Sequence, residues 1–372
     1  MKKTILIICE SLGGGVRKHI VDILMNIDKD KFNVHLIYSS NRADKIFFDN
    51  LSIFESDGVK LYNFPEMQRE ISIFKDVKCL IKIIKLINNI KPSLIHCHSS
   101  KAGLLGRIAA FILRKKALYT PHAYYAQNIN LGKIKRLLYI LFERALSKLT
   151  YKTINVSYGE NRFAIKNNIV NEENSIVILN GLKKPELNDK SWEKNDDFIV
   201  GNIARVDTQK NPYLFISIAE YLIKENLDIS FVFAGDGPLF NEVKAYVKKK
   251  KLDSKITFTG FTDKPIEVLS KFDVYLSSSN YEGLPYSVIE AMALKKPLVL
   301  TDVIGHTELV KNNYNGQLFK LNDVKAAALV IKKLYTNRKL YDEYSKNSCE
   351  YFDKNYTIDK MIMSLEKLYL SI

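Results

Sequence analysis

Short apolar runs alternate with longer helical patterns along most of this 372-residue chain. The runs are rich in β-branched and aromatic residues, which favours strands. In the first half we expect strands at Thr4–Ile8, Asn33–Tyr38, Val59–Tyr62, Leu94–Cys97, Ala117–Thr120, Thr153–Val156 and Ile176–Leu179. In the second half we expect them at Phe198–Ile203, Ile229–Ala234, Ile256–Thr259, Val274–Leu276 and Leu298–Leu300. Strands that alternate with helices predict parallel sheets covered by helices.

A polar, proline-containing stretch separates the two halves of this pattern. We therefore predict an N-terminal domain over 1–182, a linker over 183–197 and a C-terminal domain over 198–355. The remaining helix, 356–372, could cross back onto the first domain. The fold class is α/β, with two doubly wound domains. Because open sheets of this kind bind ligands beyond the carboxyl ends of their strands, we expect a cleft between facing domains.

The net charge of +15 lies almost entirely in the first half. Residues 1–180 contain 28 Lys or Arg and 15 Asp or Glu, and residues 101–150 contain ten basic residues and one acidic residue. A one-sided basic surface predicts a polyanionic partner, which could be membrane headgroups, a diphosphate-linked substrate or nucleic acid.

The four cysteines are scattered, and no apolar run reaches the roughly 18 residues that a membrane-spanning helix requires. Scattered cysteines are typical of a reducing compartment. The apolar N-terminus is too short for a signal peptide and is expected to be a strand. We therefore expect a cytoplasmic protein.

Two glutamates eight positions apart, Glu282 and Glu290, are the most informative candidates. Glu282 lies in a turn after an expected strand, and Glu290 lies in the helix that follows. Pro285 suits the first turn of that helix, where no amide donor is needed. Free amides at a helix N-terminus attract anionic or hydroxyl-rich ligands. Two carboxylates that accept hydrogen bonds, beside several backbone amides that donate them, suit a sugar attached to a nucleotide.

Other strand ends carry groups that suit an anionic ligand. Gly13–Gly15 follows the first strand, where glycine lets a ligand approach the backbone, although a plain tight turn is the alternative. Arg205 and Lys210 could grip a diphosphate, or form a solvated surface pair. At Gly260 the edge of a nucleotide base could approach the backbone, with the ring of Phe261 beside it. Alternatively, Phe261 could be a core residue.

The histidines of the first half follow expected strands. His122 could hydrogen-bond a sugar hydroxyl or stabilise positive charge, whereas an inert loop histidine is the alternative. His96 and His98 share one face of a strand while Cys97 points away. No further ligands are expected to cluster beside them, so no metal site is predicted. His98 and Lys101 are expected to face an acceptor.

The stretch 133–152 combines apolar residues with six Lys or Arg. Such a helix can lie in a membrane interface, or it can pack on its domain with a lysine-rich outer face. The residues leave both alternatives open. The stretch 75–91 is similar, and there the packing helix is favoured.

The run from Glu282 to Glu290 resembles the E-x7-E signature of retaining, nucleotide-sugar-dependent glycosyltransferases of family 4, which have the two-domain GT-B fold. The resemblance covers nearly the whole chain, because further motifs occur in the expected order: Gly13–Gly15, His122, Asn180-Gly181, Arg205 with Lys210, and Gly235–Pro238. His98–Arg107 with Thr120–His122 is similar to the branch that builds bacterial capsular, exopolysaccharide and O-antigen units. Gly305-His306 departs from the Gly-Gly pair that many members have before Glu308.

The resemblance implies a role for each candidate. Arg205 and Lys210 would bind the donor diphosphate, Glu290 the ribose, and Glu282 the donor sugar. His122 and Glu282 would be catalytic, and His98 and Lys101 would lie on the acceptor side. The implied donor-binding residues are Gly14, Gly15, Arg205, Lys210, Gly260, Phe261, Glu282, Gly283, Leu284, Pro285 and Glu290. The resemblance implies no metal and no cofactor, with a UDP-sugar as co-substrate.

We therefore expect a peripheral enzyme at the inner face of the cell membrane. It would transfer a hexose or N-acetylhexosamine from a nucleotide-diphosphate sugar to a lipid-diphosphate-linked saccharide, and its basic N-terminal domain would bind an anionic membrane surface. One rival is a sugar-nucleotide epimerase of the same architecture. A nucleic-acid-binding protein is the other rival, but the chain has no zinc-finger pattern or RNA-binding aromatic motif, so no nucleic-acid partner is expected.

Overall fold

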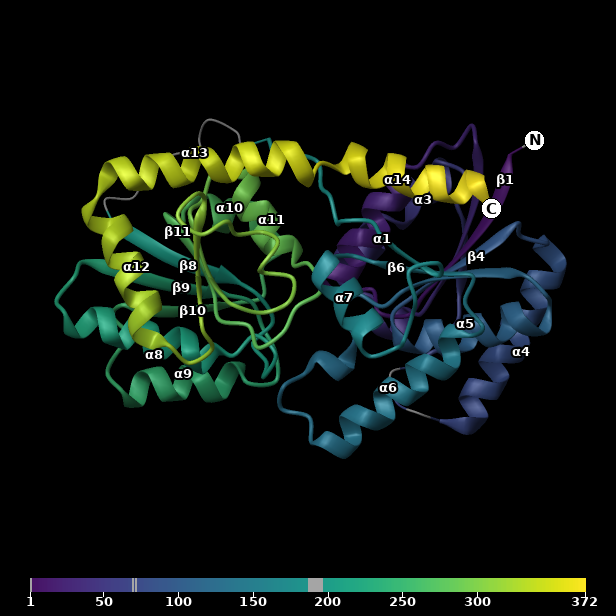
Figure 1. Ribbon diagram of the computed structural model, residues 1–372, viewed down its shortest axis with the longest axis horizontal. Coiled ribbons are helices and arrows are strands. Elements are labelled where there is room, and N and C mark those ends of the chain that lie inside the picture. The colour runs from purple at the N-terminus through teal and green to yellow at the C-terminus, as the bar shows by residue number, and fades with distance from the viewer. Residues whose placement is uncertain (1, 69, 71, 187–196) are drawn as a thin grey trace. The chain divides into compact units, whose positions relative to one another are not determined.

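The computed structural model describes residues 2–68, 70, 72–186 and 197–372. The chain forms two compact units (Figure 1). Unit 1 contains the residues up to Asn180 together with Ile358–Ile372, and unit 2 contains Gly181–Thr357. Most of the predicted linker, 187–196, lies outside the described residues.

Unit 1 is built, in its described part, on seven parallel strands in the order β3-β2-β1-β4-β5-β6-β7. The strands are β1 (Lys3–Cys9), β2 (Phe32–Tyr38), β3 (Lys60–Asn63), β4 (Leu94–His98), β5 (Lys116–Thr120), β6 (Lys152–Asn155) and β7 (Ser175–Val177). The helices are α1 (Gly14–Asn26), α2 (Lys45–Asp49), α3 (Leu51–Ser56), α4 (Ile73–Ile90), α5 (Ser100–Ile112), α6 (Lys133–Ser147), α7 (Tyr158–Lys166) and α14 (Ile358–Ser371). Short 3₁₀ turns cover Ser40–Arg42 and Tyr125–Gln127.

Alternate residues of β1 face opposite sides of this sheet, as the pleat requires. Ile5 and Ile7 lie in a core cluster with residues of α1 and α14. Leu6 and Ile8 lie in a second cluster with residues of α4 and α5. The sheet is therefore buried on both faces, which explains why its strands read as continuous apolar runs.

Unit 2 is built on six parallel strands within residues 197–357, in the order β10-β9-β8-β11-β12-β13. The strands are β8 (Phe198–Ile203), β9 (Ile229–Ala234), β10 (Ile256–Gly260), β11 (Val274–Ser277), β12 (Leu298–Thr301) and β13 (Gly316–Phe319). The helices are α8 (Pro212–Lys224), α9 (Phe240–Lys249), α10 (Pro265–Ser270), α11 (Tyr286–Ala293), α12 (Val324–Thr336) and α13 (Arg338–Asn355). β13, which the pattern did not predict, is a four-residue edge strand that starts at a glycine.

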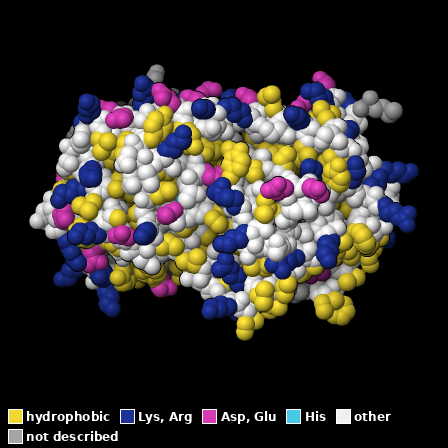
Figure 2. Space-filling view, in the orientation of Figure 1, with side chains coloured by type: hydrophobic (Ala, Val, Ile, Leu, Met, Phe, Trp, Pro, Cys, Tyr) yellow, Lys and Arg dark blue, Asp and Glu magenta, His cyan; other side chains and the backbone are white. Residues whose placement is uncertain are grey.

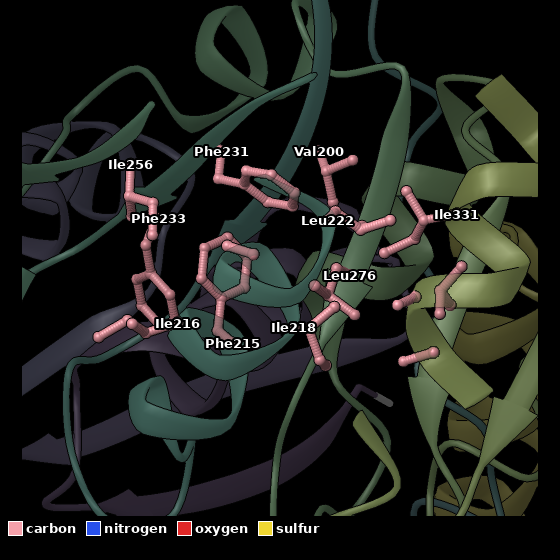
Figure 3. Packing of buried hydrophobic residues seen from close by; sticks show 14 of the residues in the cluster. Val200, Phe215, Ile216, Ile218, Leu222, Phe231, Phe233, Ile256, Leu276 and Ile331 are labelled. Atoms are coloured by element: carbon pink, nitrogen blue, oxygen red, sulfur yellow. The ribbon is translucent and has the colours of Figure 1, made fainter. Parts of the chain in front are cut away.

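The core of unit 2 packs α8 against the central strands (Figure 3). The ring of Phe215 on α8 stands nearly perpendicular to the ring of Phe233 on β9, with centroids 5.3 Å apart. Burying one such side chain stabilises the fold by about 1.5–3 kcal/mol. This packing holds β8 beside β11. At that pair the strand order reverses, which is where open parallel sheets bind ligands.

Candidate active site

Lys210 and Glu282 form a buried ion pair at the carboxyl ends of β8 and β11. The Lys210 Nζ lies 2.5 Å from the Glu282 Oε1, and the two side chains are 15% and 7% exposed. Lys210 lies in the loop between β8 and α8, and Glu282 lies in the turn between β11 and α11. Two groups 72 residues apart in the sequence therefore meet at the reversal point of the sheet.

Backbone and amide hydrogen bonds join these two loops. The Asn280 amide nitrogen donates to the Gln209 carbonyl at 2.7 Å, and the Asn280 side chain donates to the Thr208 carbonyl at 2.7 Å. The Gln209 side chain donates in return to the Tyr281 carbonyl at 3.0 Å. Because each loop satisfies polar groups of the other, Lys210 and Glu282 are held in fixed places.

The surroundings of Glu282 keep it ionised. Burial by itself raises the pKa of this carboxyl, but the charge of the Lys210 ammonium, together with side-chain hydrogen bonds from Lys210 and Ser279, outweighs that effect and holds the pKa below its usual range. Burial lowers the pKa of His306 to about 4. The Nδ1 of this neutral imidazole lies 2.9 Å from the Thr301 carbonyl, to which it donates. Glu282 is thus a charged acceptor at neutral pH.

The Gly305-His306 pair, where many family members have Gly-Gly, lies against the turn that carries Glu282. Gly305 has φ +87°, and a Cβ added there would lie 2.4 Å from the Gly283 carbonyl oxygen. The loop after β12 therefore packs directly on the turn that carries Glu282. His306, which is fully buried, fills the space beside this contact.

The other predicted donor-binding residues surround the same strand ends. Glu290 and Leu284 are buried, and Gly283 and Pro285 complete the turn. Pro285 is the N-cap of α11, one position before the first helical turn where the sequence placed it. The backbone amides at the start of α11 consequently follow the Glu282 turn directly.

Arg205, Gly260 and Phe261 are less enclosed. The Arg205 guanidinium lies 3.0 Å from Asp207 and donates to the Gln209 side chain at 3.2 Å, and its side chain is 60% exposed. Gly260 ends β10 with φ +81°, a left-handed conformation that favours glycine. Phe261 is 60% exposed, so the core alternative for this ring is wrong.

Unit 1 carries a histidine cluster at the carboxyl ends of β4 and β5. His98 ends β4 and His122 follows β5, and the His98 Nδ1 lies 3.0 Å from the His122 Nε2. The ring of His19 on α1 lies 4.7 Å from that of His122, centroid to centroid. Burial lowers the pKa of His98 and of His122 well below the usual range, and that of His19 to about 4. All of these rings are neutral at pH 7.

Two buried glutamates hold the loops of this cluster. Glu160 accepts from the Ala123 amide at 2.7 Å and from the Val156 amide at 2.8 Å. Glu10 accepts from the Ser99 hydroxyl at 2.6 Å and from the Ala102 amide at 3.0 Å. His122, Ala123 and Ser99 have positive φ, and these hydrogen bonds maintain that costly conformation.

Gly14, Gly15 and Lys101 occupy different settings in unit 1. Gly14 and Gly15 are exposed in the first turn of α1, and Gly14 has φ +59°. Lys101 is buried and its ammonium lies 2.7 Å from both carboxylate oxygens of Asp76. An acceptor-side role for Lys101 would require Asp76 to release it.

Sequence reasoning missed His19, Glu10 and Glu160. The sequence predicted no further ligands beside His98, yet the structure places nitrogen atoms of His19 and His122 near it. One signal was available for Glu10 and His19, because both flank the glycine-rich turn at the end of the first strand. Glu160 had none, since its contacts to Ala123 span 37 positions.

Two parallel-sheet units of this kind define an α/β protein of the GT-B class. The model for Glycosyltransferase Family 4 matches residues 13–183, and the model for Glycosyl transferases group 1 matches residues 183–350. Together the two models cover both units almost completely. The chain belongs to glycosyltransferase family 4 and is a glycosyltransferase.

Similar proteins extend over the whole chain. An Escherichia coli UDP-Gal:alpha-D-GlcNAc-diphosphoundecaprenol alpha-1,3-galactosyltransferase is 28% identical over 96% of this chain and 94% of its own length. The capsular polysaccharide biosynthesis glycosyltransferase CapM of Staphylococcus aureus is 24% identical over 94% of this chain and 96% of its own length. The crystal structure of Anabaena HepE with UDP-glucose superposes with a TM-score of 0.82 at 18% identity, covering 99% and 100% of the two chains, which shows the shared fold.

Proposed function

We propose that this enzyme transfers a hexose or N-acetylhexosamine, with retention of configuration, from a UDP-sugar to a lipid-diphosphate-linked saccharide in bacterial surface polysaccharide synthesis. The observation that carries the proposal is the largely buried Lys210–Glu282 pair at the reversal point of the sheet in unit 2, the region that matches the model for Glycosyl transferases group 1. Relatives from Escherichia coli and Campylobacter jejuni are named for transfer to saccharides on diphosphoundecaprenol, which supports this class of acceptor.

In unit 2 the proposed roles follow from charge and exposure. Lys210 and the exposed Arg205 side chain would neutralise the negative charge that builds on the departing UDP. The ionised Glu282 would accept hydrogen bonds from donor-sugar hydroxyls, with the amides of Gly283, Leu284 and Pro285 beside it. Glu290 would hold the ribose hydroxyls. The exposed Phe261 ring and Gly260 would flank the base.

In unit 1 the neutral His122 would lie beside the transferred sugar, and His98 would lie on the acceptor side. Gly14 and Gly15 would close over a phosphate at the start of α1. A cavity of about 50 Å³ is lined by Ala123, which follows His122, and by Tyr139 and Phe142 of α6. This cavity, which is too small for a saccharide, lies between α6 and the loop that follows His122.

Substitution of the ion pair tests the donor site. We expect Lys210→Ala and Glu282→Ala each to lower the rate of sugar transfer by about 10²–10³-fold, because each removes a charged group that faces the reacting diphosphate or sugar. Lys248→Ala is the matched control, since that lysine is exposed in the last turn of α9. Rates are measured with UDP-sugars and a lipid-diphosphate saccharide, and near-normal transfer by either site variant would refute the assignment.

A screen of nucleotide sugars by thermal unfolding identifies the donor independently of the acceptor. The true donor stabilises the native protein by mass action and should raise the unfolding temperature most. Lys210→Ala should remove this shift. If no UDP-sugar shifts the transition of the unaltered protein, the UDP-sugar assignment fails.

We further propose that α6 binds the inner face of an anionic membrane. Apolar side chains stand exposed along this helix, with Ile134, Leu137 and Leu138 each more than half exposed. Lys133, Lys135 and Arg136 lie among them. Figure 2 shows hydrophobic side chains beside Lys and Arg over the part of unit 1 where Figure 1 places α6. In the described residues, no helix is long and apolar enough to span a bilayer.

Vesicle binding tests this surface. The unaltered protein should bind vesicles that contain anionic lipid, less tightly as salt rises, because the attraction combines apolar insertion with screened charge. The double variant Ile134→Ser and Leu138→Ser should bind weakly, whereas Met363→Ser and Leu370→Ser on α14 should bind normally, since that pair is also exposed. Equal binding by both double variants would contradict the role of α6.

A further inference from the structure

The histidine cluster of unit 1 brings together ligand atoms from three separate elements. His19 comes from α1, His98 from the end of β4, and His122 from the loop after β5. One nitrogen from each of these rings lies within 4.8 Å of the other two. We propose that His19, His98 and His122 form a binding site for a divalent transition-metal ion such as Zn²⁺, and that this ion inhibits the enzyme.

The spacing of the closest pair fits a shared ion. The His98 Nδ1 and His122 Nε2 atoms lie 3.0 Å apart. In a tetrahedral site with metal–nitrogen distances of about 2.0–2.1 Å, neighbouring ligand nitrogens are about 3.3 Å apart. A small separation of these two rings would admit an ion between the two atoms, and His19, whose nitrogen lies within 4.8 Å of both, would approach as the third ligand.

The His98 ring is also available for coordination. Among the described residues the His98 Nε2 is buried without a hydrogen-bond partner, so His98 has no hydrogen bond outside the cluster that an ion would need to break. His19 and His98 are buried, whereas His122 is only partly buried. We expect an ion to enter past His122 and to keep a water molecule as its fourth ligand.

The ligand chemistry selects the class of ion. The cluster contains imidazoles and no carboxylate, and imidazole suits Zn²⁺, Ni²⁺, Co²⁺ and Cu²⁺, whereas Mg²⁺ and Ca²⁺ require oxygen ligands. The loops are already held in place by Glu160 at Ala123 and by Glu10 at Ser99. The site therefore needs little reorganisation on binding.

Inhibition rests on the proposed role of His122, whereas binding does not. An ion bound to His122 removes that imidazole from the transferred sugar and places a positive charge next to it. Sugar transfer itself would need no metal, and the ion would be an inhibitor that takes no part in the reaction.

Titration of the untagged, chelator-treated protein with Co²⁺ tests the site directly. We expect one Co²⁺ per chain with the visible absorption of a tetrahedral complex, displaced by Zn²⁺. His19→Gln and His98→Gln should each weaken binding by at least about tenfold, because even the loss of an outer-shell partner costs roughly that much. His35→Gln is the matched control, since His35 lies on β2 and contacts Tyr62.

Circular dichroism of each metal-free variant shows whether it is folded. Because two ligand variants are made, the test still works if one of them does not fold. Absence of a stoichiometric tetrahedral complex, or unchanged binding in both folded ligand variants, would overturn the site. Transfer assays with Zn²⁺ separate the two proposals. Tight binding without inhibition would refute the inhibitory role and the placement of His122 at the sugar, whereas loss of the site would leave the transferase function intact.

Discussion

At the scale of single residues, the turn that carries Glu282 is shaped by a glycine on another loop. Gly305 has a left-handed backbone and presses on the Gly283 carbonyl, so no Cβ fits between them. The next residue of this loop, His306, is fully buried. The position of the Glu282 carboxylate thus depends on a residue 23 positions away.

Gly305→Ala should therefore damage both stability and donor binding. Left-handed strain alone costs about 1–2 kcal/mol, and the clash with Gly283 adds to that cost. Gly58→Ala is the matched control, because Gly58 has φ +80° with no atom of the described chain within 4 Å of its added Cβ. Urea unfolding and donor-induced thermal shifts measure the two effects. Equal losses in both variants would show that the contact with Gly283 is unimportant.

The residues that could be predicted are those whose type and position at a strand end already imply a ligand. Glu282, Lys210 and Arg205 belong to this group, and the family match supports the activity they imply. Their pairing could not be predicted, because Lys210 and Glu282 meet only through the sheet order. Lys101 shows the same limit, since its partner Asp76 lies on a different helix.

At the scale of elements, the last helix completes the core of the first unit. α14 contributes Met361, Leu365 and Leu368 to the cluster that also contains Ile5 and Ile7. The Tyr369 hydroxyl lies 2.6 Å from the His96 Nδ1, so the helix also reaches the strand that ends at His98. Periodicity predicted a helix here. The unit on which this helix packs could not be predicted from the pattern, because an apolar helix face can pack against many different surfaces.

Leu365→Ala should lower the free energy of unfolding by about 2–5 kcal/mol, because the leucine is 2% exposed and leaves a cavity under α14. Met363→Ala is the control on the same helix, since Met363 is 69% exposed and should change stability by no more than about 0.5 kcal/mol. Chemical denaturation followed by circular dichroism measures both. A loss below about 1 kcal/mol for Leu365→Ala would mean that α14 is only loosely attached.

At the scale of the whole molecule, most strands and helices could be predicted because each sheet is parallel and its central strands are buried on both faces. Continuous apolar runs then mark the strands clearly. The exceptions are small: α2, α3 and β13 are short, and β13 lies at a sheet edge with few apolar residues. The two units do not correspond to two continuous segments of the chain, because unit 1 is assembled from two separate segments.

Separate expression of the units tests this division. Residues 181–357 should fold alone and bind the UDP-sugar donor weakly, because the residues proposed for UDP lie there. Residues 1–180 alone should aggregate, and joining them to 358–372 through a short flexible linker should restore a folded protein. Gel filtration and circular dichroism distinguish these states. A stable, monomeric 1–180 fragment would contradict the need for α14.

The two-segment makeup of unit 1 also sets an order of events during synthesis on the ribosome. Residues 181–357 emerge and can fold while the sheet that precedes them still lacks α14, which shares the cover of one face with α1. Because N-terminal regions otherwise tend to fold first, this chain leaves an incomplete apolar surface exposed until residues 358–372 are released. A truncation that removes residues 358–372 would therefore harm the histidine-bearing unit, although the sheet of that unit lies entirely within residues 1–180.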